Sequence, residues 1–565
     1  MTTERDRRRV RLARGPVTGL PAAAFSVNDD SPSGATPTVR AARAGGTHDM
    51  ASSDMATSAR IARFGAVSAA HLSPTPAELE RLRRVACGQE EADLVVRGGT
   101  VVIVHTGDLL RRDLLIVGRF IAAVTRPGAL AGRRALDASG RFLLPAYVDG
   151  FIRVERTLLT PGELARLVVP RGTATLLADP SQLVALCGAR GGQLVTATGT
   201  PVRLLAGVPG VPGVPGVPPD AAFPDPARRV PRQAVPLPEP PRAVHPPVER
   251  TEADEAWDAL MEASGGRTVV DLTVNGHLDR DVRRAVDAGM DPMIAVRMAT
   301  LDPARRYGLD HLLGSLAPAR LADIQIVSDI AGSAAPEVVL VNGRMAADRG
   351  RPLFDNLDGV PDWSRDRVAL PLGLHSGSFA VPALSAGTGS GTRIGVSATG
   401  TPHIETVPVQ PVIISGTAHA VADPEHDLLK IALLLRGTGR VERPDRAAGT
   451  RVGFIRGVGL RQGAIAMTTS VAPGDLAIIG AGDHDMMTAA RALEGMGGGF
   501  VVVDRGWVLA ACPLPVAGVM SDAPWEAVRD QLAGVDSAAA SLGCRLPSPF
   551  LALAPLGLRL CPRPS

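Results

Sequence analysis

The stretch 146-AYVDGFIRVERTLLTP-161 lies where an apolar run ends and a polar segment that can start a helix begins. Its frame, in which Asp149 stands six residues before Glu155, is that of a strand end that binds a metal ion. Residues two apart on a strand point to the same side, so Phe151 and Arg153 share a face where ligands are expected. Phenylalanine has no lone pair to donate, and arginine is a permanent cation. The stretch therefore has the frame of a metal site without its ligands.

The composition describes a large chain without a strong overall charge. Its 565 residues leave room for two to four domains, and an apolar content of 45% is enough for large cores. The formal net charge is +3, and the first twenty residues supply the excess, with six arginines against Glu4 and Asp6. The rest of the chain is nearly neutral, which gives no electrostatic argument for a nucleic-acid partner.

Signals for targeting and for disulfides are weak. No run approaches 18 apolar residues, so we expect no membrane span, and no apolar signal region follows the N-terminal charges. The five cysteines lack C-x-x-C spacing, which favours free thiols over a disulfide framework or a thiolate zinc site. We therefore expect a cytoplasmic protein. Residues 1–72, rich in Arg, Ala and Ser, are predicted to be a disordered tail, with a basic targeting segment as the alternative.

Ordered structure is expected from about residue 73. Residues 73–88 combine a Ser/Thr-Pro start, apolar positions at helical spacing and a final glycine, which predict a helix. Short Val, Ile and Leu runs between glycines and charged turns follow, and a similar set returns at 322–350. These two groups of strands predict one composite β-domain formed by 73–145 and 321–384.

The chain between the two strand groups is too short for a complete barrel. Residues 146–198 and 251–320 together hold about half of the roughly 250 residues of a (β/α)₈ barrel, so a truncated barrel is expected. Residues 199–250 contain 15 prolines and V-P-G repeats. They are interpreted as a Pro-rich linker, with a ligand for a peptide-recognition domain as the alternative. Residues 385–565 alternate strand-like runs with a helix at 483–499, which predicts a C-terminal α/β domain.

Segments along most of residues 75–560 resemble the bacterial adenine deaminases of the amidohydrolase superfamily. They include LDASGRFLLPAYVDG (136–150), NGHLDRDVRRAVDAGMDPM (275–293) and PLPVAGVMSD (513–522). The resemblance implies an α/β protein with a split β-sandwich flanking a truncated (β/α) amidohydrolase barrel, plus a C-terminal α/β domain. It also implies hydrolysis of adenine to hypoxanthine and ammonia in purine salvage. In the family a divalent metal such as manganese or iron activates the attacking water.

The resemblance also shows where the family's metal ligands would lie in this chain. The family's His-x-His pair falls on Phe151 and Arg153, and Glu155 continues the same strand face. The Glu of a Pro-His-Glu tripeptide falls on Gln182, and the Asp of a Thr-Asp-Asp-Arg segment falls on Gly265. Because these replacements supply no ligand, we expect a degenerate metal site, no bound cofactor and impaired deaminase activity.

Few polar residues of a catalytic site remain, so no catalytic set is predicted. Glu155 and His277 are interpreted as remnants of one, and a turn or helix-cap position is the alternative for His277. Asp279 is expected to be the N-cap of the helix that follows it. The cluster 483-DHD-485 looks like a metal site, but its position at the start of a helix favours capping and compensation of the helix dipole.

Three interpretations of function remain open at this point. The chain is an active aminohydrolase with a different ligand set, or a non-catalytic purine-binding or oligomer-forming pseudoenzyme, or a product that does not fold stably. The lost ligands rank the first interpretation behind the other two. A purine ligand and a second copy of the chain are the partners that the second interpretation would require.

Overall fold

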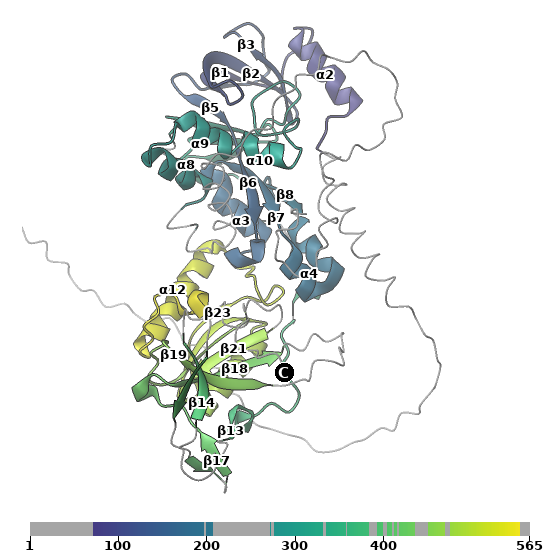
Figure 1. The fold of residues 1–565 in the computed structure, drawn as a ribbon. Helices are drawn as coiled ribbons and strands as arrows, with labels where there is room; N and C mark the ends of the chain where they lie inside the picture. The colour runs from purple at the N-terminus through teal and green to yellow at the C-terminus, as the bar shows by residue number, and fades with distance from the viewer. Residues whose placement is uncertain are drawn as a thin grey trace, which may run out of the picture. The chain divides into compact units, whose positions relative to one another are not determined.

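The computed structural model is a mixed α/β protein with several separate sheets (Figure 1). Gly265, residues 1–71 and most of the Pro-rich segment 199–250 lie outside the described residues. Within the described part, no helix is both long and apolar enough to cross a membrane. The structure describes residues 72–196, 199–206, 272, 276–331, 335–356, 359–365, 367–382, 393–398, 404–408, 412–414, 417–435, 450–468 and 475–553.

The described chain begins with helix α2 (Pro76–Ala86), where the sequence predicts a helix. A capping box closes its first turn: the Thr75 hydroxyl accepts from the Glu78 amide at 3.2 Å, and the Glu78 carboxylate accepts from the Thr75 amide at 2.8 Å. The buried residues Leu82 and Val85 belong to one apolar cluster with residues of the neighbouring sheet. The helix is therefore fixed both by its cap and by its apolar face.

A nine-stranded sheet combines strands from two distant segments, in the order β12-β11-β10-β9-β5-β1-β2-β3, with β4 paired to β1. Strand β9 pairs antiparallel with β5, so that Val327 lies opposite Phe142. The two strand groups that the sequence predicts to share a domain are thus hydrogen-bonded into one sheet. The strands are β1 (Leu94–Ile103), β2 (Asp108–Val117), β3 (Phe120–Thr125), β4 (Ala135–Asp137), β5 (Phe142–Pro145), β9 (Ile324–Val327), β10 (Val338–Val341), β11 (Arg344–Asp348) and β12 (Arg351–Pro352).

A small parallel sheet, in the order β6-β7-β8, follows directly after β5. Helix α3 connects β6 to β7, and the Val148 amide of β6 donates to the Ala299 carbonyl at 2.9 Å, which attaches the later helices to this sheet. The described part of this β/α unit has three strands, against the eight of a complete barrel. Its elements are β6 (Tyr147–Ile152), η1 (Val154–Thr157), α3 (Pro161–Val168), η2 (Val169–Arg171), β7 (Thr173–Ala178), α4 (Ser181–Cys187), η3 (Gly188–Gly192), α5 (Gln193–Thr196), β8 (Arg203–Ala206), α8 (Leu278–Asp287), α9 (Pro292–Met298) and α10 (Leu301–Arg306).

The C-terminal part contains an eight-stranded sheet, β15-β14-β19-β18-β21-β20-β22-β23, and a three-stranded one, β13-β17-β16. The helix predicted over 483–499 ends earlier, at Gly495, and Gly497 to Gly499, all at positive φ, lead into β22. The elements are β13 (Val381–Pro382), β14 (Arg393–Ala398), β15 (Ile404–Pro408), β16 (Val412–Ile414), β17 (Thr417–Ala420), β18 (Leu429–Leu435), β19 (Arg451–Arg456), β20 (Ala464–Met467), β21 (Asp475–Gly480), α11 (Asp483–Gly495), β22 (Gly499–Asp504), β23 (Trp507–Pro513), α12 (Trp525–Ser541) and α13 (Pro549–Leu553), with short 3₁₀ turns at η4 (Asp362–Ser364), η5 (Ser376–Phe379) and η6 (Pro424–His426).

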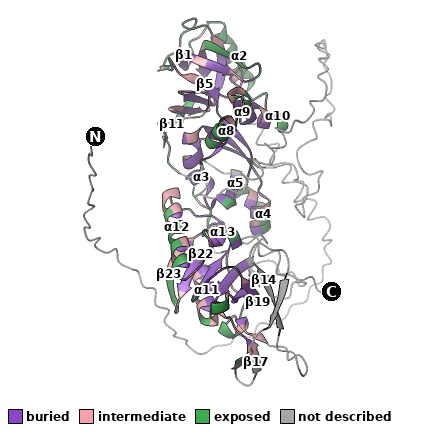
Figure 2. Ribbon diagram, turned by 60° about the vertical axis from the view of Figure 1, so that its left-hand side comes forward, coloured by how far each residue is buried: buried purple, intermediate pink, exposed green. Residues whose placement is uncertain are grey.

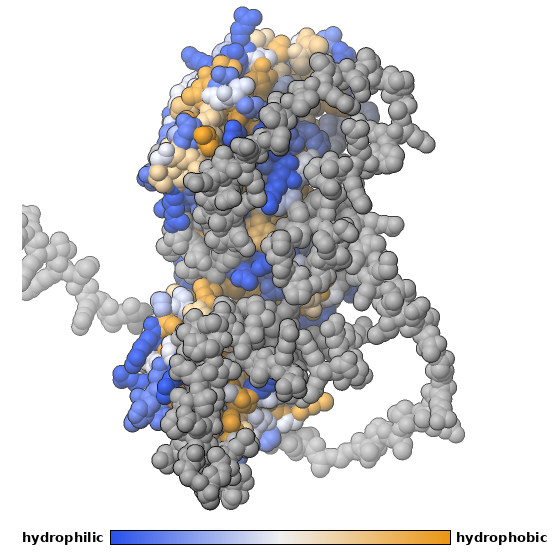
Figure 3. Space-filling model, viewed as in Figure 1, coloured by the Kyte–Doolittle hydropathy of each residue, from blue (hydrophilic) through white to orange (hydrophobic). Residues whose placement is uncertain are grey.

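The largest apolar cluster joins the β/α unit to the C-terminal sheet. Leu164 of α3 and Ile479 of β21 belong to it, each almost completely buried. The Ser521 amide also donates to the Leu158 carbonyl at 2.8 Å. Most described residues of β20, β21 and β22 are buried, as the colouring of β22 in Figure 2 illustrates. On the face shown in Figure 3, hydrophilic and hydrophobic residues are mixed among the coloured atoms.

Candidate active site

The stretch that lacks metal ligands forms the end of β6 and the turn that follows. Phe151 lies within the strand, which ends at Ile152, and Arg153 lies just past it. Glu155 is in the 3₁₀ turn η1, so the expectation that it continues the strand face is wrong, because the chain turns before reaching it. Strands β6 and β7 are parallel, so their carboxyl ends form one edge, the side on which α/β sheets bind ligands.

Arg153 is held by a carboxylate from the end of the neighbouring strand. Its Nε donates to Oδ2 of Asp179 at 3.1 Å, and its Cζ lies 5.4 Å from the centre of the Phe151 ring. The other carboxylate oxygen, Oδ1, accepts from the Ser181 amide at 2.9 Å. The guanidinium therefore contacts both the ring and the carboxylate at this edge.

These residues do not fit a divalent metal. The guanidinium of Arg153 already balances the charge of Asp179, and a second cation beside it would be repelled. Gln182, in the first turn of α4, offers a neutral amide where the family resemblance places a carboxylate. Across the described residues, no group of three or more His, Cys, Asp or Glu side chains is placed to hold a metal ion. Gly265, the fourth replaced position, is outside the described part.

Glu155 is a buried acid close to this edge. The residue is only 2% exposed, and among the described residues no other residue forms a hydrogen bond with either of its carboxylate oxygens. Its pKa is raised to about 7, mainly by burial and to a smaller extent by the negative charge of Asp179, against the opposing effects of a backbone hydrogen bond and of Arg153 and Arg156. Burial also lowers the pKa of the Arg156 guanidinium. An acid with a pKa near neutrality can act as a proton carrier, but here no described polar group receives the proton.

His277 takes the helix-cap position that the sequence offers as its alternative, but its side chain is buried and bonded to other residues. Its Nε2 lies 2.9 Å from Oδ2 of Asp149 and its Nδ1 lies 2.8 Å from Oγ1 of Thr173, and the imidazole is 2% exposed. An ionised carboxylate only accepts, so the proton of the first contact is on Nε2. The backbone of His277 occupies the N-cap position of α8, but its side chain makes no capping bond. The imidazole instead connects α8 with the middle of β6 and with the first residue of β7.

The order Thr173, His277, Asp149 resembles a nucleophile, base and carboxylate relay. Thr173 and its hydroxyl are buried, with the residue 0% exposed, so a substrate has no access to the hydroxyl. The three residues therefore form a structural hydrogen-bond network and not a site for nucleophilic catalysis. The prediction that Asp279 is an N-cap is wrong. Its Oδ1 accepts from the His277 amide at 2.8 Å, and its Oδ2 pairs with Arg171 at 3.3 Å, one residue inside the helix.

The cluster 483-DHD-485 does not cap α11 in the predicted way either. Gly482 occupies the N-cap position, without a side-chain bond. Asp483 accepts two hydrogen bonds from Nζ of Lys430, at 2.6 and 2.9 Å, and Asp485 accepts from the Gly506 amide at 2.7 Å. Both acids lie in the first turn of the helix, where its dipole favours negative charge as predicted, and their side chains reach β18 and the β22–β23 hairpin.

Sequence reasoning missed the residues that organise this region. Asp149, Thr173 and Asp179 make its central contacts, and only Asp149 carried a signal, as the Asp of the strand-end frame. Arg203 is a further buried residue of this kind, and its guanidinium contacts Thr175 at 2.7 Å and Asp323 at 2.9 Å. These partners are 28 and 120 residues away in the chain, so spacing alone could not indicate them.

Comparison with known proteins places the chain in a class and then in a family. The model of the amidohydrolase family matches residues 256–346, and the model of the adenine deaminase C-terminal domain matches residues 405–564. The amidohydrolases are therefore the class to which this β/α unit and its neighbouring sheet are related. The chain belongs to the adenine deaminase family, as the resemblance in its sequence predicts.

Whole-chain relatives carry this assignment. An adenine deaminase from Moorella thermoacetica is 32% identical and covers 86% of this chain and 95% of its own length. One from Desulforamulus reducens is 27% identical over 86% of this chain and 95% of its own. A solved zinc-bound adenosine deaminase from Xanthomonas campestris is 13% identical, covers 47% of this chain and 95% of that chain, and has a TM-score of 0.27. A score this low carries no argument, so the assignment rests on sequence.

Proposed function

We propose that this chain is an adenine deaminase-type amidohydrolase in which the family reaction, hydrolysis of adenine to hypoxanthine and ammonia, is impaired. The observation that carries the proposal is the contact between Arg153 and Asp179 at the carboxyl end of β6 and β7. A positive side chain occupies the edge where a divalent ion would have to bind, and it uses the nearest carboxylate. Water has a pKa of about 15.7 without such an ion, so it is a poor nucleophile at neutral pH.

The neighbouring residues do not replace the missing chemistry. Glu155 has a suitable pKa for proton transfer, but it is buried without a described partner through which a proton could reach a substrate. His277 is bonded through both nitrogens to buried groups. A positioned acid or base contributes about 10²–10⁴ in rate, and neither residue is placed to make that contribution.

The test is hypoxanthine formation by the full-length protein with adenine and added Mn²⁺, Fe²⁺ or Zn²⁺. The expected result is no turnover above a protein-free control, while circular dichroism and a cooperative melt show that the sample is folded. The variant carrying Phe151→His and Arg153→His together is expected to remain inactive, because two imidazoles supply only part of a catalytic metal shell. Metal-dependent turnover by the unaltered chain would contradict the proposal.

A further inference from the structure

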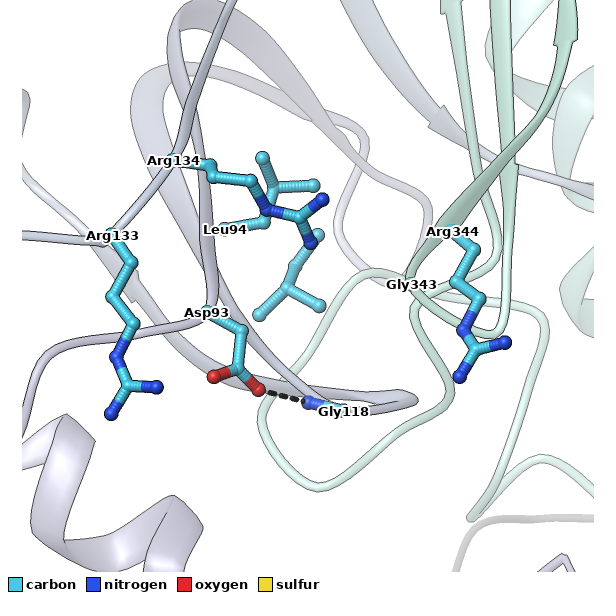
Figure 4. A pocket seen from close by; sticks show the side chains of 8 residues that line it. Asp93, Leu94, Gly118, Arg133, Arg134, Gly343 and Arg344 are labelled. Atoms are coloured by element: carbon cyan, nitrogen blue, oxygen red, sulfur yellow. Dashed lines mark hydrogen bonds between the residues drawn. The ribbon is translucent and has the colours of Figure 1, made fainter.

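A cavity of about 420 Å³ opens in the nine-stranded sheet, away from the edge of β6 and β7. Two parts of the sheet that are far apart in sequence form its walls (Figure 4). One wall holds the start of β1, the turn after β2 and the segment before β4, and the other is the β10–β11 hairpin. It is lined by Asp93, Leu94, Ile116, Gly118, Arg133, Arg134, Gly343 and Arg344.

Three of the lining residues are arginines. Arg133 and Arg134 precede β4, and Arg344 lies across the cavity in the hairpin, as Figure 4 shows. All three are exposed. None of their guanidinium groups makes a hydrogen bond or an ion pair with another described residue. Each guanidinium group carries five N–H donors that can bind a ligand.

Asp93, the acid of the cavity, is paired mainly with Arg81, and the charge of Arg133 has a smaller effect on it. Arg81 binds its two carboxylate oxygens at 2.6 and 3.0 Å, and the Gly118 amide donates to one of them at 2.8 Å. The hydrogen bonds from Arg81 are the main reason that the pKa of Asp93 is lowered, so it stays ionised and bound to Arg81. The cavity therefore keeps an excess of positive charge from the three arginines.

The backbone holds the two walls close together. Gly343 has a φ of 71°, and a Cβ atom at this position would lie 2.3 Å from the Gly118 carbonyl oxygen. Only glycine permits this approach of the hairpin to the β2–β3 turn, and Arg344 is the next residue. Its guanidinium is consequently presented opposite Arg133 and Arg134 by a rigid turn and not by a loop end.

We propose that this cavity binds the phosphate group of a small phosphorylated molecule. A phosphate carries up to two negative charges and several acceptor oxygens, which guanidinium groups from two directions can contact in a fork geometry. The volume lies within the range of about 300–1,000 Å³ found for small-molecule pockets. Leu94 and Ile116 add an apolar part to the lining, against which the body of an organic phosphate can pack.

The proposal is tested by isothermal titration calorimetry of the full-length protein with inorganic phosphate, adenosine 5′-monophosphate and adenosine, in a phosphate-free buffer. Saturable binding of at least one phosphate compound is expected, weaker at high salt because exposed charges are screened. Tighter binding of the monophosphate than of inorganic phosphate would identify an organic phosphate as the ligand, and the reverse order would identify the free ion.

Two variants and a control locate the site. Arg134→Gln and Arg344→Gln are each expected to weaken phosphate binding about tenfold, or about 1.4 kcal/mol, because each removes a charge-assisted hydrogen bond. Arg111→Gln removes an exposed arginine of the same sheet that does not line the cavity, and should bind as the unaltered chain does. No saturable binding of either phosphate, or an equal loss in Arg111→Gln, would overturn the proposal.

Discussion

Glu155 shows how a single buried residue makes the stability of this protein depend on pH. Its pKa is raised from the ordinary value of 4.5 to about 7, mainly by burial. The folded state therefore keeps the proton to higher pH than the unfolded state. The contribution of Glu155 to the free energy of unfolding is fully present below about pH 4.5 and is lost as the pH rises through about 7. Above that pH the contribution changes no further.

The substitution Glu155→Gln is predicted to remove this loss of stability at high pH, because glutamine does not ionise. The shift corresponds to about 3 kcal/mol, so the variant should gain stability relative to the unaltered chain at pH 8 and not at pH 4. Urea unfolding at the two pH values measures the difference. An equal effect of the substitution at both would show that Glu155 titrates normally in the folded protein.

His277 and Asp149 form a buried histidine–aspartate pair, and His426 and Asp423 form an exposed pair of the same kind. The side chains of both are 2% exposed, whereas those of His426 and Asp423, 2.8 Å apart, are 74% and 48% exposed. His277→Ala leaves a buried carboxylate without its partner and is predicted to destabilise by about 3 kcal/mol. His426→Ala should have little effect. Thermal unfolding of the two variants compares them, and similar midpoints would contradict the structural network assigned to His277.

From the sequence it was easier to exclude a role for a residue than to assign one. Phe151 and Arg153 exclude metal ligation from their chemistry alone, without coordinates. The network of His277 could not be predicted, because its partners Asp149 and Thr173 are 128 and 104 residues away. A histidine before a helix has the same local pattern whether it caps the helix or faces the core.

At the scale of elements, helix α3 depends on a buried acid that reaches other parts of the fold. The Glu163 side chain, 5% exposed, accepts from Arg166 at 2.7 Å, from Nδ2 of Asn356 at 3.1 Å and from the Trp525 amide at 3.0 Å. The last of these bonds satisfies an amide at the beginning of α12, which the helix itself leaves unpaired. One carboxylate thus connects α3 with α12 and with the segment after β12.

Glu163→Ala is predicted to destabilise the protein by about 2–4 kcal/mol, because three donors lose a charged acceptor and two of them come from other elements. The matched control is Glu80→Ala, which removes an exposed acid three residues before Arg83, to which it is paired on α2. The control should unfold as the unaltered chain does. Equal denaturation midpoints for all three proteins would show that this carboxylate does not hold the elements together.

Elements whose sequence signals lie in consecutive residues were predicted well. The residue at which a strand ends was harder to predict. Helix α2 carries its cap, apolar face and terminal glycine in consecutive residues, so its range follows from the sequence. Strand β6 was expected to continue to Glu155, but it ends at Ile152 because η1 begins at Val154. Alternation of side chains cannot show that end, since a short 3₁₀ turn keeps the apolar residues buried.

At the scale of the whole molecule, the family relationship and the metal chemistry point in different directions. Relatives that are adenine deaminases match 86% of the chain, and both family models match parts of it. The pairing of β5 with β9 joins the two strand groups into the sheet next to the β/α unit. The edge of β6 and β7, however, holds an arginine bound to an aspartate. The family assignment follows from the full chain, whereas the proposed loss of activity rests on a few residues at this edge.

The central claim is that these changes abolish the metal centre. The most direct test is the metal content of the full-length protein, produced with Mn²⁺, Fe²⁺ and Zn²⁺ in the medium, purified without chelators and measured by mass spectrometry of the elements. We predict far less than one equivalent of any of these metals per chain after dialysis, because Phe151, Arg153 and Gln182 provide no anionic or imidazole ligand. One or more tightly bound equivalents per chain would contradict this account.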